Sequence, residues 1–299
     1  MSDKLSISLG TAPYNWGRKR LLEFYLDELA DVSADEVYVG NNICHQREIL
    51  TNEDLKNIAQ ALNRQGKKGY FSTLTLCTKA EEVDGLNEKC RYFDGVEVNM
   101  IGFLNQLKDT DKEIVLGPYL NLYNWKSAAY MQKFHPVKLV ASFEIPLDSI
   151  ADIADKSGIP VEVMAWGNIS TALSWRCYTA RAVNRSRENC GKICFEYPEG
   201  MLLKSVENED LFRIDGLQVL SAKTHSLIEY LPLLAEKQIS SIRIYPSMEN
   251  TGKIVDVFRQ VIAAHLTAKT GGEQLVSYAP HGVCNGWFLG KPGWEYVAA

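Results

Sequence analysis

The sequence predicts an α/β protein of the (β/α)8 TIM-like barrel type, with a cysteine-containing loop insertion late in the chain. Short β-rich runs alternate with helical patterns of about ten residues, which is typical of βαβ units and a parallel sheet. Several of the runs are apolar throughout, as expected for strands covered on both faces. An open doubly wound sheet is the alternative, but no G-x-G-x-x-G fingerprint follows a strand to favour it.

Nine runs have the character of strands, one more than a barrel of this type uses. The expected strands are 5–9, 36–40, 70–76, 95–99, 113–116, 137–143, 160–165, 217–222 and 240–244. The expected helices between them are 18–30, 54–64, 79–89, 101–107, 125–134, 148–156, 228–236 and 253–269. The surplus run is expected to be a helix, a loop or a strand outside the barrel.

We expect one domain over residues 1–299, because no Pro/Gly/Ser-rich linker or low-complexity tract divides the chain. The regular alternation stops after Trp166. Residues 174–216 are rich in Arg, Cys, Asn, Glu and Gly and contain no run as clearly strand-like as the earlier ones. This segment is therefore interpreted as the insertion.

Composition limits the class of protein. Of the 299 residues 46% are hydrophobic and 23% are charged, which is typical of a folded globular chain rather than a disordered one. The net charge of −5 makes nucleic acid an unlikely partner. No secretory signal and no run of about 18–20 apolar residues is present, so a cytoplasmic location without a membrane span is expected.

Seven cysteines are the unusual feature, because stable disulfides are rare in a reducing compartment and an odd number cannot pair completely. Cys177, Cys190 and Cys194 lie within the insertion, and Cys44 follows the strand 36–40. The carboxyl ends of barrel strands are where functional residues lie. This pattern favours a metal site over unrelated thiols. Zinc usually takes closely spaced cysteine pairs, whereas an iron–sulfur cluster accepts more scattered ligands.

The charge around these cysteines bears on which metal group they could bind. Five basic residues accompany the inserted cysteines: Arg176, Arg181, Arg185, Arg187 and Lys192. They could lower the pKa of the thiols and offset a negative cluster, or they could simply be solvated on a surface loop. A C-x3-C-x2-C radical motif is absent, since Tyr197 stands at its third position. Four protein ligands would leave no iron of the cluster open to a substrate, so the cluster would be an electron carrier, a sensor or a structural element.

The remaining cysteines have simpler interpretations. Cys77 ends an apolar strand and Cys90 ends a helical pattern, so both are expected to be structural. Cys284 lies in a predicted turn, where a spare ligand is the less favoured reading.

Residues 175–181, WRCYTAR, followed by Cys190 and Cys194 before the YPEG of 197–200, resemble the U32 "collagenase-like peptidase" family. Further similar segments are 37–40 leading to Cys44, 71–74, 120–124, 161–163 and 284–287. The resemblance covers most of the chain. It is greatest to the members of the family that act in ubiquinone biosynthesis.

The resemblance implies a [4Fe–4S] cluster held by Cys44, Cys177, Cys190 and Cys194. It implies an iron–sulfur subunit required for the oxygen-independent hydroxylation of a ubiquinone precursor. The implied partners are a paralogous U32 protein, in a heterodimer, and a lipid-carrier accessory protein. Peptidase-type members carry a histidine where this chain has Trp166, so the general base is missing and proteolysis is not expected.

Two other functions stay open from the sequence. One is a non-catalytic scaffold whose cluster is structural and whose contact surface includes Trp287, Phe288 and Trp294, unless these aromatics are core residues. The other is an RNA-hydroxylation factor, as other members of the family are similar to such factors. The net charge disfavours that function, although the basic loop could contact phosphates.

A few further side chains are candidates for a role in the site. Glu144 and Glu162 follow or end strands where barrel carboxylates can be catalytic, but a salt bridge to Arg176 or Arg243 is an equally good interpretation. His45, next to Cys44, could donate a hydrogen bond that tunes a cluster.

Overall fold

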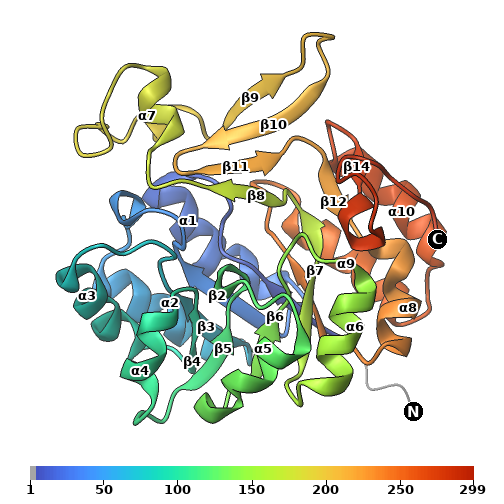
Figure 1. The fold of residues 1–299 in the computed structure, drawn as a ribbon, viewed down its shortest axis with the longest axis horizontal. Coiled ribbons are helices and arrows are strands. Elements are labelled where there is room, and N and C mark those ends of the chain that lie inside the picture. The colour runs from blue at the N-terminus through green and yellow to red at the C-terminus, as the bar shows by residue number, and fades with distance from the viewer. Residues whose placement is uncertain (1–4) are drawn as a thin grey trace.

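The computed structural model describes residues 5–299 and confirms the predicted barrel (Figure 1). Eight parallel strands follow one another around it, and β13 closes it by pairing with both β1 and β7. At the closure Leu9 lies opposite Ile244, and Ile242 lies opposite Val163. The strands are β1 (Ser6–Leu9), β2 (Glu36–Gly40), β3 (Lys68–Ser72), β4 (Gly95–Val98), β5 (Glu113–Leu116), β6 (Lys138–Val140), β7 (Val161–Gly167) and β13 (Ser241–Ile244).

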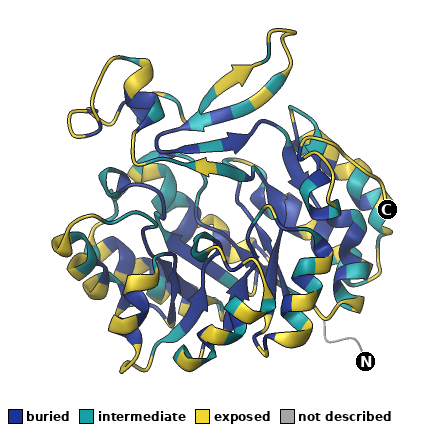
Figure 2. Ribbon diagram, in the orientation of Figure 1, coloured by how far each residue is buried: buried dark blue, intermediate teal, exposed yellow. Residues whose placement is uncertain are grey.

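Helices surround the barrel and leave the strands buried, as the dark blue ribbon in Figure 2 shows. They are α1 (Gly17–Leu26), α2 (Asn52–Arg64), α3 (Ala80–Cys90), α4 (Leu104–Leu107), α5 (Trp125–Tyr130), α6 (Leu147–Lys156), α8 (Leu231–Glu236), α9 (Thr251–Ile262) and α10 (Ala268–Leu275). Helix α2 shows why such segments form. Thr51 and Asp54 make a capping box at its start, and Leu55, Ile58 and Leu62 form its buried face. None of the helices in residues 5–299 is long and apolar enough to cross a membrane.

The single helix expected at 253–269 is wrong. Helix α9 ends at Ile262 and α10 begins at Ala268. Between them Ala264 has a left-handed backbone, with φ at 58°, which stops the first helix. Thr267 then caps the second, because its hydroxyl accepts a hydrogen bond from the backbone N–H of Thr270 at 3.1 Å.

The surplus strand lies outside the barrel. Residues 217–222 contain β11 (Gln218–Ser221), part of a four-stranded antiparallel sheet in the order β8-β11-β10-β9. The other strands are β8 (Ser170–Leu173), β9 (Met201–Lys204) and β10 (Asp210–Asp215). The insertion is thus not all loop, since it holds two strands and the short helix α7 (Tyr178–Ala182). Strand β8 directly follows β7, so this sheet stands over the carboxyl-terminal end of the barrel (Figure 1).

The last part of the chain packs beside β7. Strand β12 (Thr224–Ser226) pairs antiparallel with β7, and β14 (Val283–Cys284) pairs parallel with β12. This extension places the segment around His281 against the outer face of β10, where it contributes to a cleft described below.

Candidate functional site

The four cysteines singled out by the sequence lie in one region, between the loop after β2 and the insertion. Cys44 lies in the loop after β2, Cys177 caps α7, and Cys190 and Cys194 flank the start of a short turn of 3-10 helix. Cys44, Cys177 and Cys190 share one buried apolar cluster. Cys194 is close enough to Cys177 for the charge of one to affect the other. The structure therefore brings together residues that are up to 150 positions apart in the chain.

Three of these sulfur atoms accept hydrogen bonds from nitrogen. The side-chain amide of Asn15 donates to Cys194 Sγ at 3.0 Å. Backbone N–H groups of Ala180 and Lys192 donate to Cys177 Sγ and Cys190 Sγ, each at 3.4 Å. Such donors stabilise negative charge on sulfur, and in iron–sulfur proteins they set the potential of the cluster.

A buried arginine that the sequence reasoning missed supplies positive charge to the site. Arg47 is 7% exposed and lies close enough to Cys194 and Cys44 to act on their charges. Its Nη1 is 2.8 Å from Asp215 Oδ2, and its Nη2 also contacts that carboxylate. Burial lowers the pKa of Arg47, but the carboxylate of Asp215 more than compensates and raises that pKa above its ordinary value.

Of the two interpretations of the basic residues in the insertion, solvation on a surface loop agrees with the structure for four of the five. Arg176, Arg181, Arg185 and Lys192 are exposed. Burial raises the pKa of the Cys177 and Cys194 thiols, and Arg47 only partly offsets this. The expected lowering of thiol pKa is therefore wrong for these two cysteines. The only signal for Arg47 in the sequence was its position three residues after Cys44.

Arg187 is the one buried member of the basic set, and it forms the outer rim of the site with His45. Its guanidinium lies 3.3 Å from the centroid of the Trp175 ring, and its Nη2 is 3.2 Å from His45 Nδ1. The same His45 nitrogen is 3.3 Å from a carboxylate oxygen of Glu82. The predicted tuning role of His45 stays a prediction, since these partners are side chains of the rim rather than sulfur.

The chemistry of the four thiols bears on which metal group they fit. Within residues 5–299, no group of three or more His, Cys, Asp and Glu side chains is placed to hold a metal ion. A four-iron cubane takes one thiolate at each of its four corners. Four buried cysteines with N–H donors and a nearby arginine fit such a cluster in chemistry.

The other three cysteines lie apart from this group. Burial raises the pKa of Cys77 to about 11 and the pKa values of Cys90 and Cys284 to about 12. Cys90 belongs to the main core, and Cys284 Sγ faces the carbonyl oxygen of Lys223 at 3.9 Å. These environments are those of structural thiols.

The candidate carboxylates are occupied by other partners. Glu162 is fully buried in the barrel, where Arg243 Nε lies 2.5 Å and Lys138 Nζ 3.0 Å from its oxygens. Burial raises the pKa of Glu162, but these two cations lower it well below its usual range. The salt-bridge interpretation with Arg243 is therefore correct. Glu144 accepts a hydrogen bond from the hydroxyl of Tyr123 at 2.7 Å.

The three aromatics proposed as a contact surface differ in exposure. Trp294 is 63% exposed, whereas Phe288 is only 3% exposed and packs edge to face against Tyr230. The inclusion of Phe288 in an exposed patch is therefore wrong. Trp166, at the position of the peptidase-type histidine, is also buried and forms a wall of a cleft at the barrel mouth.

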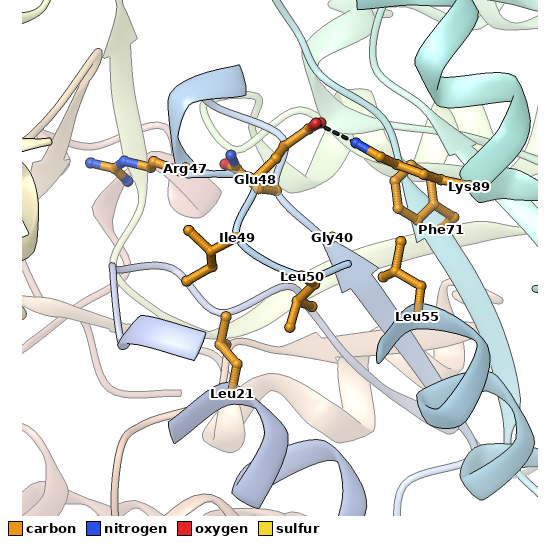
Figure 3. Close-up of a pocket in the computed structure, with 10 residues that line it drawn as sticks. Leu21, Gly40, Arg47, Glu48, Ile49, Leu50, Leu55, Phe71 and Lys89 are labelled. Atoms are coloured by element: carbon orange, nitrogen blue, oxygen red, sulfur yellow. Dashed lines mark hydrogen bonds and ion pairs between the residues drawn. The ribbon is translucent and has the colours of Figure 1, made fainter. Parts of the chain in front are cut away.

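A small pocket lies beside the cysteine region (Figure 3). Its volume is about 40 Å³, room for a few water molecules but not for an organic substrate. The Glu48–Lys89 ion pair spans its edge, and the guanidinium of Arg47 points away from its apolar side chains. We therefore assign this pocket no ligand.

One protein-family model, described as Peptidase family U32, matches residues 25–297 of this chain. Among solved structures, the U32 peptidase Mk0906 is 11% identical, covering 83% of this chain and 95% of that one, with a TM-score of 0.47. The Rubisco of Pyrococcus horikoshii OT3 is 7% identical over 92% of this chain and 63% of its own, with a TM-score of 0.49. A Thermobaculum terrenum O-GlcNAc hydrolase mutant is 10% identical, covering 92% of this chain and 62% of that one, with a TM-score of 0.47.

Proposed function

Because the chain belongs to peptidase family U32, we propose that it is a UbiV-like iron–sulfur subunit required for oxygen-independent hydroxylation in ubiquinone biosynthesis. Its partner in a heterodimer would be a paralogous, UbiU-like U32 protein, with a lipid-carrier accessory protein delivering the ubiquinone precursor. The proposed location is the cytoplasm. The proposal rests on the resemblance of the cysteine-bearing segments and on the site that those segments form.

One observation carries the proposal: four buried cysteines from two distant parts of the chain lie together beside one buried arginine, and three of them accept a hydrogen bond from an N–H group. Cys44, Cys177, Cys190 and Cys194 would each bind one iron of a [4Fe–4S] cluster. When bound, that cluster would supply one-electron transfer. Asn15 would orient and polarise the Cys194 sulfur, and Arg47 would offset the negative charge of the thiolates.

Burial of the four cysteines affects the electrostatics of the site. All four cysteines are 7–8% exposed, so the protein shields the thiolates from bulk water. A lower local dielectric strengthens the influence of Arg47 and of the N–H donors on the cluster. Proteolysis is not proposed, because the buried Trp166 cannot act as a general base.

The cluster is tested by anaerobic purification followed by iron and sulfide analysis and absorption spectroscopy. We expect about four irons per chain. Cys177→Ala and Cys194→Ala should lose iron. Cys90→Ala and Cys284→Ala, which remove buried thiols elsewhere, should keep it. Protein that contains only zinc, or iron retained by both site variants, would contradict the proposal.

The hydroxylation is tested with the chain alone and with the reconstituted pair, supplied with a ubiquinone precursor without oxygen. We expect product from the pair. A pair whose activity survives the loss of this chain's cluster would instead support the scaffold function. One observation favours that second candidate: the edge strand β9 and its neighbours expose Leu203, Val206 and Trp294.

The RNA-hydroxylation function is addressed by a binding assay. The exposed basic side chains of the insertion are the surface that would contact phosphates. We expect the chain to retain no RNA at low salt. Retention that falls steeply as salt rises would support that function instead.

A further inference from the structure

A second cavity opens at the barrel mouth, beside the cysteine region but separate from it. It lies at the carboxyl ends of β7, β13 and β1, three adjoining strands, and has a volume of about 180 Å³. This end of a parallel barrel is where ligands bind. Five aromatic side chains are among its lining residues: Tyr14, Trp16, Trp166, Tyr245 and Tyr278. We call it the aromatic cleft.

Glycines make room for the tyrosine rings of the aromatic cleft. A Cβ at Gly10 would lie 2.8 Å from the ring of Tyr245, and one at Gly167 would lie 2.8 Å from Tyr245 Cβ. A Cβ at Gly200 would come within 3.3 Å of the ring of Tyr14. Glycine at these three positions therefore lets Tyr245 and Tyr14 pack closely against the backbone.

The charges at the rim of the cleft are already matched. Arg213 donates to the carbonyl oxygen of Glu199 at 2.6 Å and to His281 Nε2 at 2.5 Å. His281 Nδ1 in turn lies 2.6 Å from Asp210 Oδ2. The carboxylate of Glu199 also lies 3.7 Å from Arg213 Nη1.

The walls of the cleft are neutral as well. The hydroxyl of Tyr14 donates to Asn168 Oδ1 at 3.0 Å. Burial raises the pKa of Tyr14 above its ordinary range and that of Tyr245 to about 12, so both phenols keep their protons at neutral pH. The cleft therefore offers aromatic faces and neutral polar groups, beside one arginine and one glutamate of opposite charge.

We propose that the aromatic cleft binds a neutral, planar aromatic ring that carries a hydroxyl group. The ring would stack against the tyrosine and tryptophan walls, and its oxygen would meet the polar groups of the rim. An anionic ring is disfavoured, because the carboxylate of Glu199 lines the cleft and would repel it. That this ring is the hydroxylation substrate rests on the proposed function.

The position of the cleft supports its use with the cysteine site. Tyr14 and Trp16, two of its walls, flank Asn15, whose amide reaches the sulfur of Cys194. Pro198 and Glu199, which also line the cleft, follow Cys194 by only a few residues. A bound ring would therefore lie one residue away from a group that contacts a proposed cluster ligand.

The binding test uses the full chain, purified without oxygen, and three small probes of similar size. They are p-cresol, its saturated analogue 4-methylcyclohexanol, and the anion 4-methylbenzoate. Saturation-transfer NMR and tryptophan fluorescence titration measure the binding. We expect p-cresol to bind about tenfold more tightly than the saturated alcohol, because only the flat ring stacks. Equal binding of the two, no binding of p-cresol, or tighter binding of the benzoate would overturn the proposal.

Substitutions in the aromatic cleft test whether p-cresol binds there. Tyr278→Leu removes one wall and should weaken p-cresol binding about tenfold. Trp294→Leu is the matched control, because Trp294 lines a neighbouring groove and not the cleft. A thermal melt tests whether each variant is folded. If Tyr278→Leu does not fold, His281→Gln serves as the second cleft variant. Equal p-cresol affinity in the wild type and a folded cleft variant would overturn the assignment.

Iron analysis of the same samples separates this inference from the proposed function. Iron-containing protein that binds no p-cresol would refute the cleft and leave the cluster in place. Protein without iron that binds p-cresol, and loses that binding in Tyr278→Leu, would refute the cluster and leave the cleft.

Discussion

Arg47 and Asp215 form a buried ion pair although they are 168 positions apart in the chain. Arg47 follows the Cys44 loop, and Asp215 ends β10 of the inserted sheet. Gln218 also donates to Asp215 Oδ2, at 3.0 Å. The pair thus joins the barrel to the sheet above it at the place where the cysteines of the two parts meet.

Removal of Arg47 should be strongly destabilising. Arg47→Met leaves the carboxylate of Asp215 buried without its cation, and we expect a loss of about 3–5 kcal/mol in the free energy of unfolding. Urea denaturation measures it. Arg91→Met is the control, because the exposed Arg91–Glu88 pair should contribute little to stability. Similar losses in the two variants would show that the buried pair has no special role.

Gly216 should tolerate no side chain, because a Cβ there would lie 2.5 Å from Arg47 Nη2. Gly216 and Gly66 have nearly the same left-handed backbone, with φ at 66° and 68°, but Gly66 has open space around it. Gly66→Ala should cost about 1–2 kcal/mol of stability from backbone strain alone. Gly216→Ala should cost about 1–3 kcal/mol more, since Arg47 must move. Equal costs in denaturation experiments would refute the close contact.

Asn15 should tune the proposed cluster. Asn15→Leu removes the N–H donor to Cys194 Sγ, which stabilises the more negative reduced state. The reduction potential should fall by roughly 40 mV, equivalent to about 1 kcal/mol for one electron. An anaerobic redox titration followed by electron paramagnetic resonance measures this. Asn189→Leu, an exposed change in the same insertion, should leave the potential unchanged. An unshifted potential in Asn15→Leu would remove the tuning role.

His225 should make the stability depend on pH. Burial lowers its pKa from 6.5 to about 4, so below pH 6.5 the unfolded chain binds a proton that the folded chain refuses. Stability therefore falls as the pH drops from about 6.5 to 4, by about 3 kcal/mol in all. His225→Gln should lose this part of the pH dependence. His265→Gln, at an exposed position, should retain it. Denaturation midpoints across this pH range provide the measurement.

Sequence periodicity was enough to predict the barrel, because short β-rich runs, several of them apolar throughout, alternate with helical patterns along most of the chain. The strands β9 and β10 were missed for a physical reason. Both lie in a sheet with one face toward solvent, and β9 exposes Leu202, Leu203 and Lys204. Their pairing with one another and with β11, rather than a strong local pattern, accounts for them as strands. The break between α9 and α10 was missed because the residues around Ala264 have ordinary helix propensity.

By itself the sequence determined the fold class, the four candidate cysteines and the resemblance to family U32, because these depend on residue type and spacing along the chain. The tertiary structure alone decided which side chains surround those cysteines. Arg47, Asp215 and Asn15 reach the site from different strands and loops, and no local pattern connects them. The partner of Glu162 was likewise decided by closure of the barrel, which sets Arg243 of β13 beside β7. Burial then determined the charges, since a group enclosed in protein is governed by its neighbours in space.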